Sequence, residues 1–127
     1  GEVARLMTSR RIHVKGAKVL VLGLTFKENC PDIRNSKVVD VVRELEKFGA
    51  QVDVHDPWVD SREAKHEYGI KPVKAPKARS YDAVVLAVSH QQFKDLGAAA
   101  VRRFGRKNAV VYDIKYLFKA DQVDGRL

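Results

Sequence analysis

A single cysteine is the first scarcity in this chain of 127 residues, and it excludes an internal disulfide bond. One thiol fits a reducing compartment, so we expect a cytoplasmic protein. No apolar run approaches the roughly 20 residues that a membrane-spanning helix needs, and no signal peptide is visible, so we expect no membrane partner. With 45% hydrophobic and 31% charged residues, the composition is that of one globular domain.

Glycine-rich phosphate-binding motifs are absent as well. The apolar run Val19–Leu22 has the character of a buried strand, and the residues after it, Gly23–Lys27, read GLTFK without a second glycine. This excludes the G-x-G-x-x-G dinucleotide fingerprint, and no P-loop occurs elsewhere. Side chains, chiefly Lys27, would therefore have to bind any phosphate group.

Spacings typical of metal ligands or of a nucleophile with its base are also missing. The four histidines show no ligand spacing, so we expect no metal site. Cys30 could act as a nucleophile, but no local spacing links it to a histidine, and we expect no catalytic residue in this chain. His90 follows an apolar run directly, and for it we favour a structural over a catalytic role.

Apolar periodicity predicts strands that alternate with helices. The expected strands are 18–22, 51–55, 70–73, 83–88 and 109–112, and the expected helices are 2–14, 36–48, 60–68, 91–96 and 98–104. Pro72 and Pro76 make the strand at 70–73 an edge strand or no strand. Asn35 or Ser36 is expected to cap the helix that follows, and Gly49 to end it.

This alternation predicts an α/β, Rossmann-like fold with a doubly wound, mostly parallel five-stranded sheet in the order 3-2-1-4-5. The switch point then lies between the first and fourth strands, where the loops 23–34, 89–92 and 113–118 meet. All three contain polar or cationic residues, which favours a site for an anionic ligand. The alternative is an ordinary solvated crossover loop.

The net charge of +8 has several explanations. Nucleic acid is one, but the basic residues are scattered and do not interleave with aromatic residues, so we expect no nucleic-acid partner. A phosphate-bearing small ligand or an acidic partner domain explains the charge equally well. The chain opens with Gly1-Glu2 and a helix-like segment. We therefore expect residues 1–15 to be the end of an interdomain helix and residues 16–127 to be one domain of a longer protein.

Five short motifs carry a resemblance to a known family. They are Gly23–Lys27, Asp32–Ser36, His55–Pro57, the pattern Ser89-His90-x-x-Phe93, and Tyr112–Lys115. Together they make the chain similar to the C-terminal UDP-binding domain of the nucleotide-sugar 6-dehydrogenases, the UDP-glucose/GDP-mannose dehydrogenase family. The wording ENCPD at 28–32 most resembles the branch that oxidises UDP-N-acetyl-hexosamines for polysaccharide biosynthesis.

The resemblance implies a four-electron, NAD-dependent oxidation of the sugar C6 hydroxyl to a carboxylate in a homodimer or higher oligomer. An N-terminal Rossmann domain would hold most of the NAD, and a central helical domain would carry the catalytic cysteine. Within this chain, it implies that Phe26, Lys27 and Lys115 bind the UDP-sugar and that Arg34 reaches the NAD pyrophosphate. Cys30 does not match the family's nucleophile motif, and Lys115 stands where many relatives have arginine.

Two other interpretations remain at this point. The chain could be a stand-alone nucleotide- or nucleic-acid-binding module, which also needs no catalytic constellation. It could also be a complete small enzyme that uses Cys30. Under the family resemblance, the chain is the substrate-binding domain of a dehydrogenase, and the isolated chain should have no activity of its own.

Overall fold

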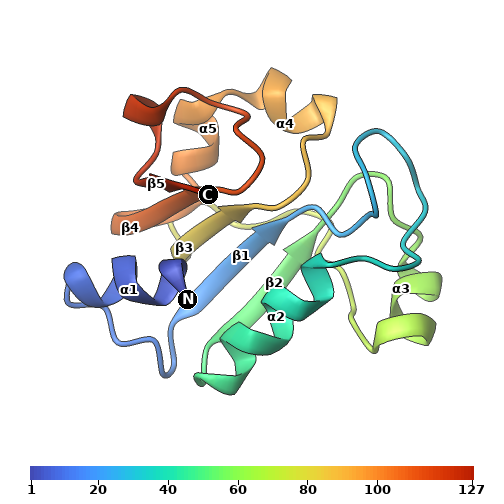
Figure 1. Cartoon of the computed structure of the whole chain (residues 1–127), viewed down its shortest axis with the longest axis horizontal. Helices are drawn as coiled ribbons and strands as arrows, with labels where there is room; N and C mark the ends of the chain where they lie inside the picture. Colours follow the sequence, from blue (N-terminus) through green and yellow to red (C-terminus); the bar gives the residue numbers. More distant parts are fainter.

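A twisted, fully parallel sheet of five strands forms the centre of the molecule (Figure 1). The structure, a computed structural model, describes residues 1–127. The strand order is β2-β1-β3-β4-β5, and the fold is α/β and Rossmann-like, as predicted. The strands are β1 (Lys18–Leu22), β2 (Gln51–His55), β3 (Tyr81–Leu86), β4 (Gly105–Asp113) and β5 (Gly125–Arg126).

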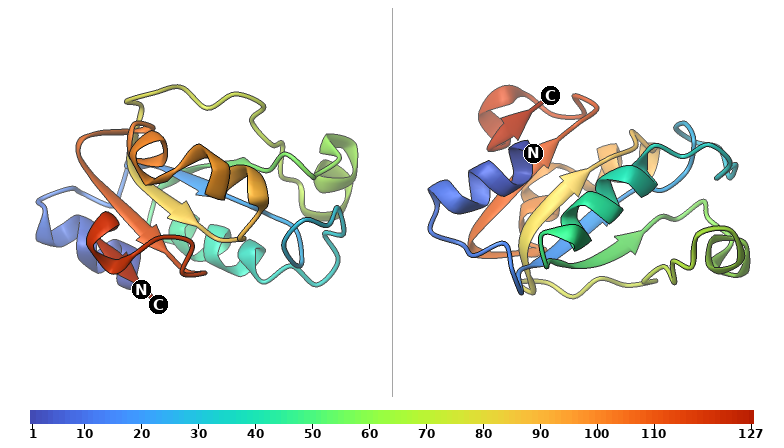
Figure 2. Two further views of the ribbon diagram at one scale, coloured as in Figure 1. Left: turned by 90° about the horizontal axis from the view of Figure 1, so that it is seen from above. Right: turned by 60° about the horizontal axis from the view of Figure 1, so that its bottom comes forward.

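Helices cover both faces of this sheet, which makes it doubly wound (Figure 2). They are α1 (Glu2–Ser9), α2 (Val38–Lys47), α3 (Ser61–Tyr68), α4 (Gln91–Leu96) and α5 (Ala98–Arg102), with a short 3-10 helix, η1 (Ala120–Gln122). No helix is both long enough and apolar enough to cross a bilayer.

The alternation of side chains along each strand divides the core into two clusters. Val19 and Val21 of β1 pack in one cluster with α1 and α2, whereas Leu20 and Leu22 pack in the other with α4 and α5. All four side chains are fully buried. Burial on both faces explains why β1 reads as a continuous apolar run.

One expected strand does not form, and an unexpected one takes its place at the opposite edge. Residues 70–73 run beside β2 but form only one backbone hydrogen bond with it. In that bond the N–H of Val73 donates to the carbonyl oxygen of Val54 at 2.7 Å. Pro72 has no N–H to extend the ladder. The fifth strand is β5, which pairs with the end of β4. The other four strands follow the predicted order.

The first helix is shorter than expected. It ends at Ser9 rather than near residue 14, because Arg11 adopts a left-handed conformation with φ of 61°. Its buried side chains, Val3 and Met7, join the cluster that α2 shares with the sheet. Residues 2–9 are thereby packed into the same core as the strands.

The predicted cap at the start of α2 is wrong, and the predicted end is confirmed. No side chain caps the helix, because the Ser36 hydroxyl donates to the carbonyl of Leu24 at 2.6 Å instead. Gly49 ends the helix with φ of 91°. The N–H of Gly49 and the N–H of Ala50 both donate back to carbonyls of the last turn, the arrangement of a Schellman motif.

Candidate functional site

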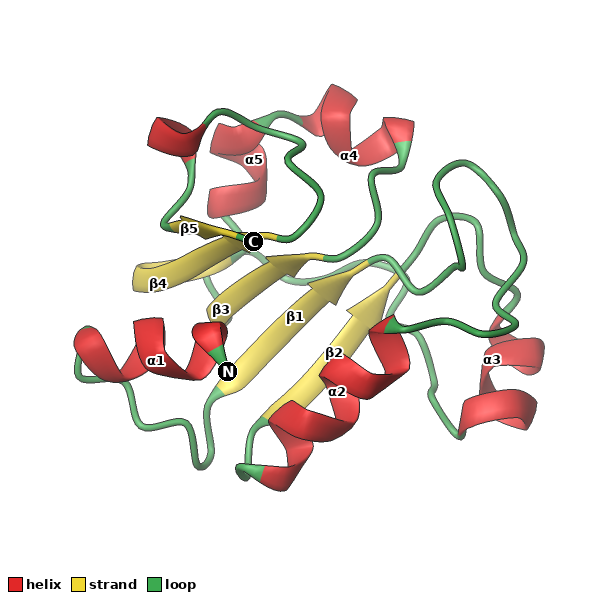
Figure 3. Ribbon diagram, in the orientation of Figure 1, coloured by secondary structure: helices red, strands yellow, loops and turns green.

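The carboxyl ends of β1 and β3 form the switch point of the sheet. From β1 the chain crosses to β2 on one side, and from β3 it crosses to β4 on the other. Figure 3 shows the long loop that leaves β1 at this edge and returns to α2. Ligand sites of open α/β sheets lie in the crevice that such a reversal creates.

A cavity of about 430 Å³ opens at this switch point. The structure brings Phe26 and Lys27, from the loop after β1, together there with Lys115, from the loop after β4. Apolar side chains, among them Val38 of α2 and Val88 after β3, line the same cavity. The loops after β1 and β4 therefore meet at one hollow, as the sequence predicts, whereas the predicted loop 89–92 contributes no lining residue and the residues just before it, Ala87 and Val88, do.

The cavity carries an excess of positive charge. Lys27, Lys37 and Lys115 line it, against one acidic side chain, that of Glu28. None of the three lysines forms an ion pair within the chain. Their ammonium groups are thus available to an anionic ligand.

Lys37 is the cation that sequence reasoning missed. It occupies the N-cap position of α2, where the partial positive charge of the helix end disfavours a cation and favours acidic residues. A lysine at that position is locally unfavourable, and this mismatch was the available signal.

Arg34, by contrast, does not line the cavity. Its side chain is 79% exposed, and its guanidinium makes a two-bond pair with the Asp32 carboxylate at 3.0 and 3.1 Å. This pair lowers the pKa of Asp32 through the hydrogen bonds from Arg34. The pair uses two N–H groups on one edge of the guanidinium, and its other N–H donors are free in this exposed side chain.

Two buried aspartates hold the loops that carry Lys27 and Lys115. Asp56, directly after β2, accepts the N–H of Leu24 at 2.6 Å and the N–H of Thr25 at 3.2 Å. Asp113, at the end of β4, accepts the N–H of Lys115 at 3.2 Å and that of Phe118 at 2.9 Å. Carboxylates positioned by the sheet thus fix the backbone on either side of the cavity.

His90 completes the support beneath the first loop. It is fully buried, and its Nε2 lies 2.9 Å from Oδ2 of Asp56, while its Nδ1 accepts the N–H of Asn29 at 2.9 Å. An accepting Nδ1 places the ring hydrogen on Nε2, which donates toward Asp56. His90 is therefore a structural anchor, consistent with the role that we favoured from the sequence.

The environment of Asp56 keeps its carboxylate charged. Burial alone would raise the pKa of Asp56, but hydrogen bonds from His90 and from the N–H groups of Leu24 and Trp58 outweigh it and lower the pKa. A carboxylate that accepts several donors is stabilised in its ionised form. At neutral pH the loop is thus tied to a buried anion.

Neither Cys30 nor a metal site adds chemistry to this cavity. The Cys30 side chain is half-buried and takes part in none of the hydrogen bonds of the structure. Nowhere do three or more histidine, cysteine, aspartate or glutamate side chains gather as metal ligands.

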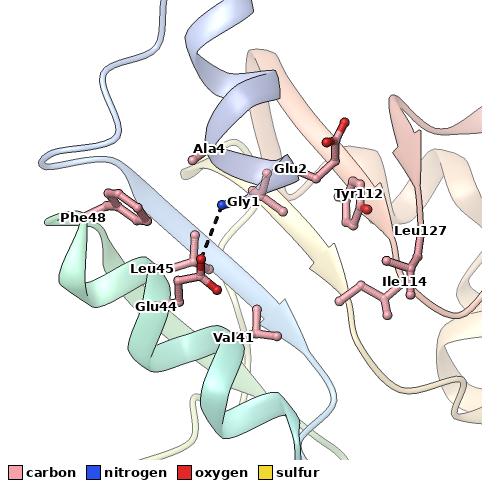
Figure 4. Close-up of a pocket in the computed structure, with 11 residues that line it drawn as sticks. Gly1, Glu2, Ala4, Val41, Glu44, Leu45, Phe48, Tyr112, Ile114 and Leu127 are labelled. Atoms are coloured by element: carbon pink, nitrogen blue, oxygen red, sulfur yellow. Dashed lines mark hydrogen bonds and ion pairs between the residues drawn. The ribbon is translucent and has the colours of Figure 1, made fainter.

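A second, apolar pocket of about 320 Å³ adjoins the cationic cavity (Figure 4). The two share Val41, Ile114 and Leu127. It is lined by two carboxylate side chains, those of Glu2 and Glu44, and by no lysine or arginine. For an anionic ligand, the cavity of the three lysines is the better candidate.

Comparison with known proteins identifies the domain. The family model described as "UDP-glucose/GDP-mannose dehydrogenase family, UDP binding domain" matches residues 20–120. The chain is 55% identical to UDP-N-acetyl-D-glucosamine 6-dehydrogenase of Pseudomonas aeruginosa and 51% identical to the enzyme of that name from Salmonella typhi, in each case over 99% of this chain. It spans about 30% of the length of either relative.

A solved structure agrees with these sequence matches. A UDP-glucose dehydrogenase from the archaeon Pyrobaculum islandicum superposes with a TM-score of 0.73 at 30% identity, over 98% of this chain and 28% of that one. The chain therefore belongs to the UDP-glucose/GDP-mannose dehydrogenase family, of which it forms the UDP-binding domain.

Proposed function

We propose that this domain holds the nucleotide end of a UDP-N-acetylhexosamine for an NAD-dependent 6-dehydrogenase, which oxidises the sugar C6 hydroxyl to a carboxylate for polysaccharide biosynthesis. The observation that carries the proposal is the cavity that Lys27, Lys37 and Lys115 line at the switch point of a UDP-binding family fold. The two relatives described above are named UDP-N-acetyl-D-glucosamine 6-dehydrogenases, which supports the sugar class.

Charge and distance explain why such a domain serves the reaction. A diphosphate carries about two negative charges, which the lysine ammonium groups would neutralise. Phe26, 56% exposed at the cavity, offers an apolar face to the nucleotide. Binding the unreactive end of the substrate positions the distant C6 atom for chemistry elsewhere in the enzyme.

NAD would be held mainly outside this chain. The residues after β1 lack the glycines that bring a backbone close to a pyrophosphate, so the domain does not fit a complete dinucleotide site. Arg34 does fit a partial contact, because its exposed guanidinium retains free donors beyond its pair with Asp32. Bound NAD would accept the hydrides of the oxidation, and Arg34 would bind its pyrophosphate.

The proposal extends to the architecture of the parent enzyme. Residues 1–15 would be the end of a helix that joins this domain to a helical domain with the catalytic cysteine, and to an N-terminal Rossmann domain. The parent would be a cytoplasmic homodimer or higher oligomer. No residue of the present chain would act as nucleophile, acid or base.

The test is calorimetric titration of UDP into the 127-residue chain and its Lys27→Ala variant. We expect Lys27→Ala to weaken UDP binding about tenfold or more, because a charge-assisted contact to phosphate is lost. Lys71→Ala is the matched control, because Lys71 is exposed, forms no ion pair and does not line the cavity. This variant should bind UDP with an affinity within about twofold of that of the unmodified chain.

Equal affinities for all three proteins would remove Lys27 from the site. In the intact enzyme, the same substitution should lower kcat/KM for the UDP-sugar.

A further inference from the structure

A second cationic cavity lies at the other end of the strands, beside the amino ends of β3 and β4. It has a volume of about 720 Å³. Five cationic side chains line it, those of Arg79, Arg102, Arg103, Arg106 and Lys107. Because all strands are parallel, this cavity and the one at the switch point lie at opposite strand ends, and they share no lining residue.

An irregularity in β4 brings two of these cations into the cavity. Tyr81 of β3 pairs with Gly105, and Ala83 pairs with Val110, so Asp82 alone lies opposite the whole stretch Arg106–Ala109. The extra residues bulge out of the ladder and expose Arg106 and Lys107. A Cβ on Gly105 would lie 2.5 Å from the Cβ of Ala109. The bulged chain therefore passes so close to Gly105 that only glycine fits at this position.

Backbone hydrogen bonds hold two further cations beside the bulge. The N–H of Arg79 donates to the carbonyl of Arg103 at 2.8 Å, which joins the segment before β3 to the end of α5. Arg79 adopts a left-handed conformation with φ of 55°. Non-glycine residues adopt this conformation rarely, and here the strained position is occupied by an arginine at the rim of the cavity.

The charge of the cavity is only partly compensated within the chain. Arg106 pairs with Asp82 at 3.0 Å, and Arg102 pairs with Asp124 at 3.1 Å. The side chains of Arg79, Arg103 and Lys107 form no hydrogen bond and no ion pair. Three like charges without counter-charges repel one another, and a bound anion would relieve that repulsion.

We propose that this cavity is a binding site for a polyphosphate anion, separate from the UDP site. Arginine forks bind phosphate oxygens in pairs, and three cations without counter-charges suit a chain of phosphates better than a single phosphate. No aromatic side chain lines the cavity, so a nucleobase would find no stacking surface. The ligand class is thus defined by linked phosphates and not by a base.

The experiment is titration of tripolyphosphate into the 127-residue chain, followed residue by residue through amide NMR shifts. We expect shifts at Arg79–Tyr81 and Gly105–Asn108. In the triple variant Arg79→Gln, Arg103→Gln, Lys107→Gln, we expect the Kd for these shifts to rise at least about tenfold.

A charge-matched control distinguishes a site from diffuse attraction. Lys65→Gln, Lys71→Gln, Lys94→Gln removes the same charge from exposed positions that line neither cationic cavity. We expect this control to bind tripolyphosphate as the unmodified chain does. Equal weakening in both triple variants, or no shifts at these residues in the unmodified chain, would overturn the proposal.

Two further measurements test the role of Lys107 and the independence of the two sites. The single reversal Lys107→Glu, on the exposed bulge, should weaken binding without a change in packing, and an unchanged Kd would count against the site. UDP affinity should be the same in the Arg79, Arg103, Lys107 variant and the unmodified chain. A failure of UDP binding therefore leaves the polyphosphate result standing, and the two proposals are tested separately.

Discussion

Asp56 is the residue on which the donors around the candidate site converge. Its carboxylate accepts hydrogen bonds from the backbone of Leu24, Thr25 and Trp58 and from the ring of His90. The side chain has no exposed surface, so water cannot replace a lost partner. Its charge state therefore controls the stability of the loop that carries Lys27.

Replacement of Asp56 by asparagine should destabilise the fold by about 2 kcal/mol at neutral pH, because the amide presents N–H donors to backbone donors. The folded-state pKa of Asp56 lies below its ordinary value of 3.8, so its contribution is complete above that value and is lost as the pH falls below it. The stability difference between the unmodified chain and Asp56→Asn should thus narrow in acid, as measured by urea unfolding across the pH range.

Asp121→Asn, at an exposed position without hydrogen bonds to its side chain, is the control and should leave stability unchanged at every pH. A constant difference between Asp56→Asn and the unmodified chain from neutral to acid pH would contradict this account of Asp56.

At this scale, the sequence allows the residues that line the cavity to be predicted better than the residues that support them. Lys27 was indicated by its place in the polar loop after the first apolar run, and Lys115 by the family resemblance; their role in binding stays a prediction. The contact between Asp56 and His90 joins residues 34 positions apart, and no local pattern reveals it. Lys37 was overlooked although a cation at the start of a helix is unfavourable and therefore conspicuous.

Among the elements, the turn from β1 into its loop leaves no room for a side chain. Gly23 adopts φ of +106°, and a Cβ there would lie 2.6 Å from the Cβ of Val88 and 2.8 Å from the backbone nitrogen of Val88. The N–H of Gly23 also donates to the carbonyl of His55 at 2.8 Å, which ties the turn to the end of β2. Any side chain at this position displaces the strand ends that border the cavity.

We expect Gly23→Ala to cost about 3 kcal/mol or more of unfolding free energy, since it adds a steric clash to an unfavourable backbone conformation. Gly69→Ala is the matched control, because Gly69 also has a positive φ, +68°, but no atom lies within 4 Å of its added Cβ. That variant should lose only about 1 kcal/mol. Urea unfolding of both variants measures the difference, and similar losses would show that the contact with Val88 is unimportant.

The elements also show what apolar patterning can and cannot predict. Ile70 is buried beside β2, so the apolar character of 70–73 correctly reported burial, but burial does not require ladder hydrogen bonds. The strand β5 has two residues and is too short to show a period of two. Longer segments with a full stripe, such as α2, were predicted within two residues of their bounds.

For the whole molecule, the distribution of the net charge of +8 matters more than its size. Cations gather at both ends of the strands: at the switch point, beside the carboxyl ends, and around the bulge of β4, beside the amino ends. Composition alone left nucleic acid, a phosphate ligand and an acidic partner as alternatives. The fold separates these cations into two cavities, which composition cannot reveal because each draws residues from distant parts of the chain.

The isolated chain should bind UDP and yet form no NADH with UDP-N-acetyl-D-glucosamine and NAD, because it contains no catalytic constellation and spans about 30% of its named relatives. Absorbance of NADH and calorimetry on the same preparation check both halves of this prediction. NADH formation that stops when the Cys30 thiol is blocked would instead favour a complete small enzyme.

The placement of the first and last residues has a practical consequence for protein engineering. Gly1 and Leu127 line the same apolar pocket (Figure 4). A short glycine-serine linker can therefore join them, and the chain can be reopened at the exposed Ala75, which lines neither cationic cavity. Such a circular permutant would move the free ends away from this pocket and from the adjoining cavity of the three lysines, so that a reporter dye or fusion partner at either end leaves both open.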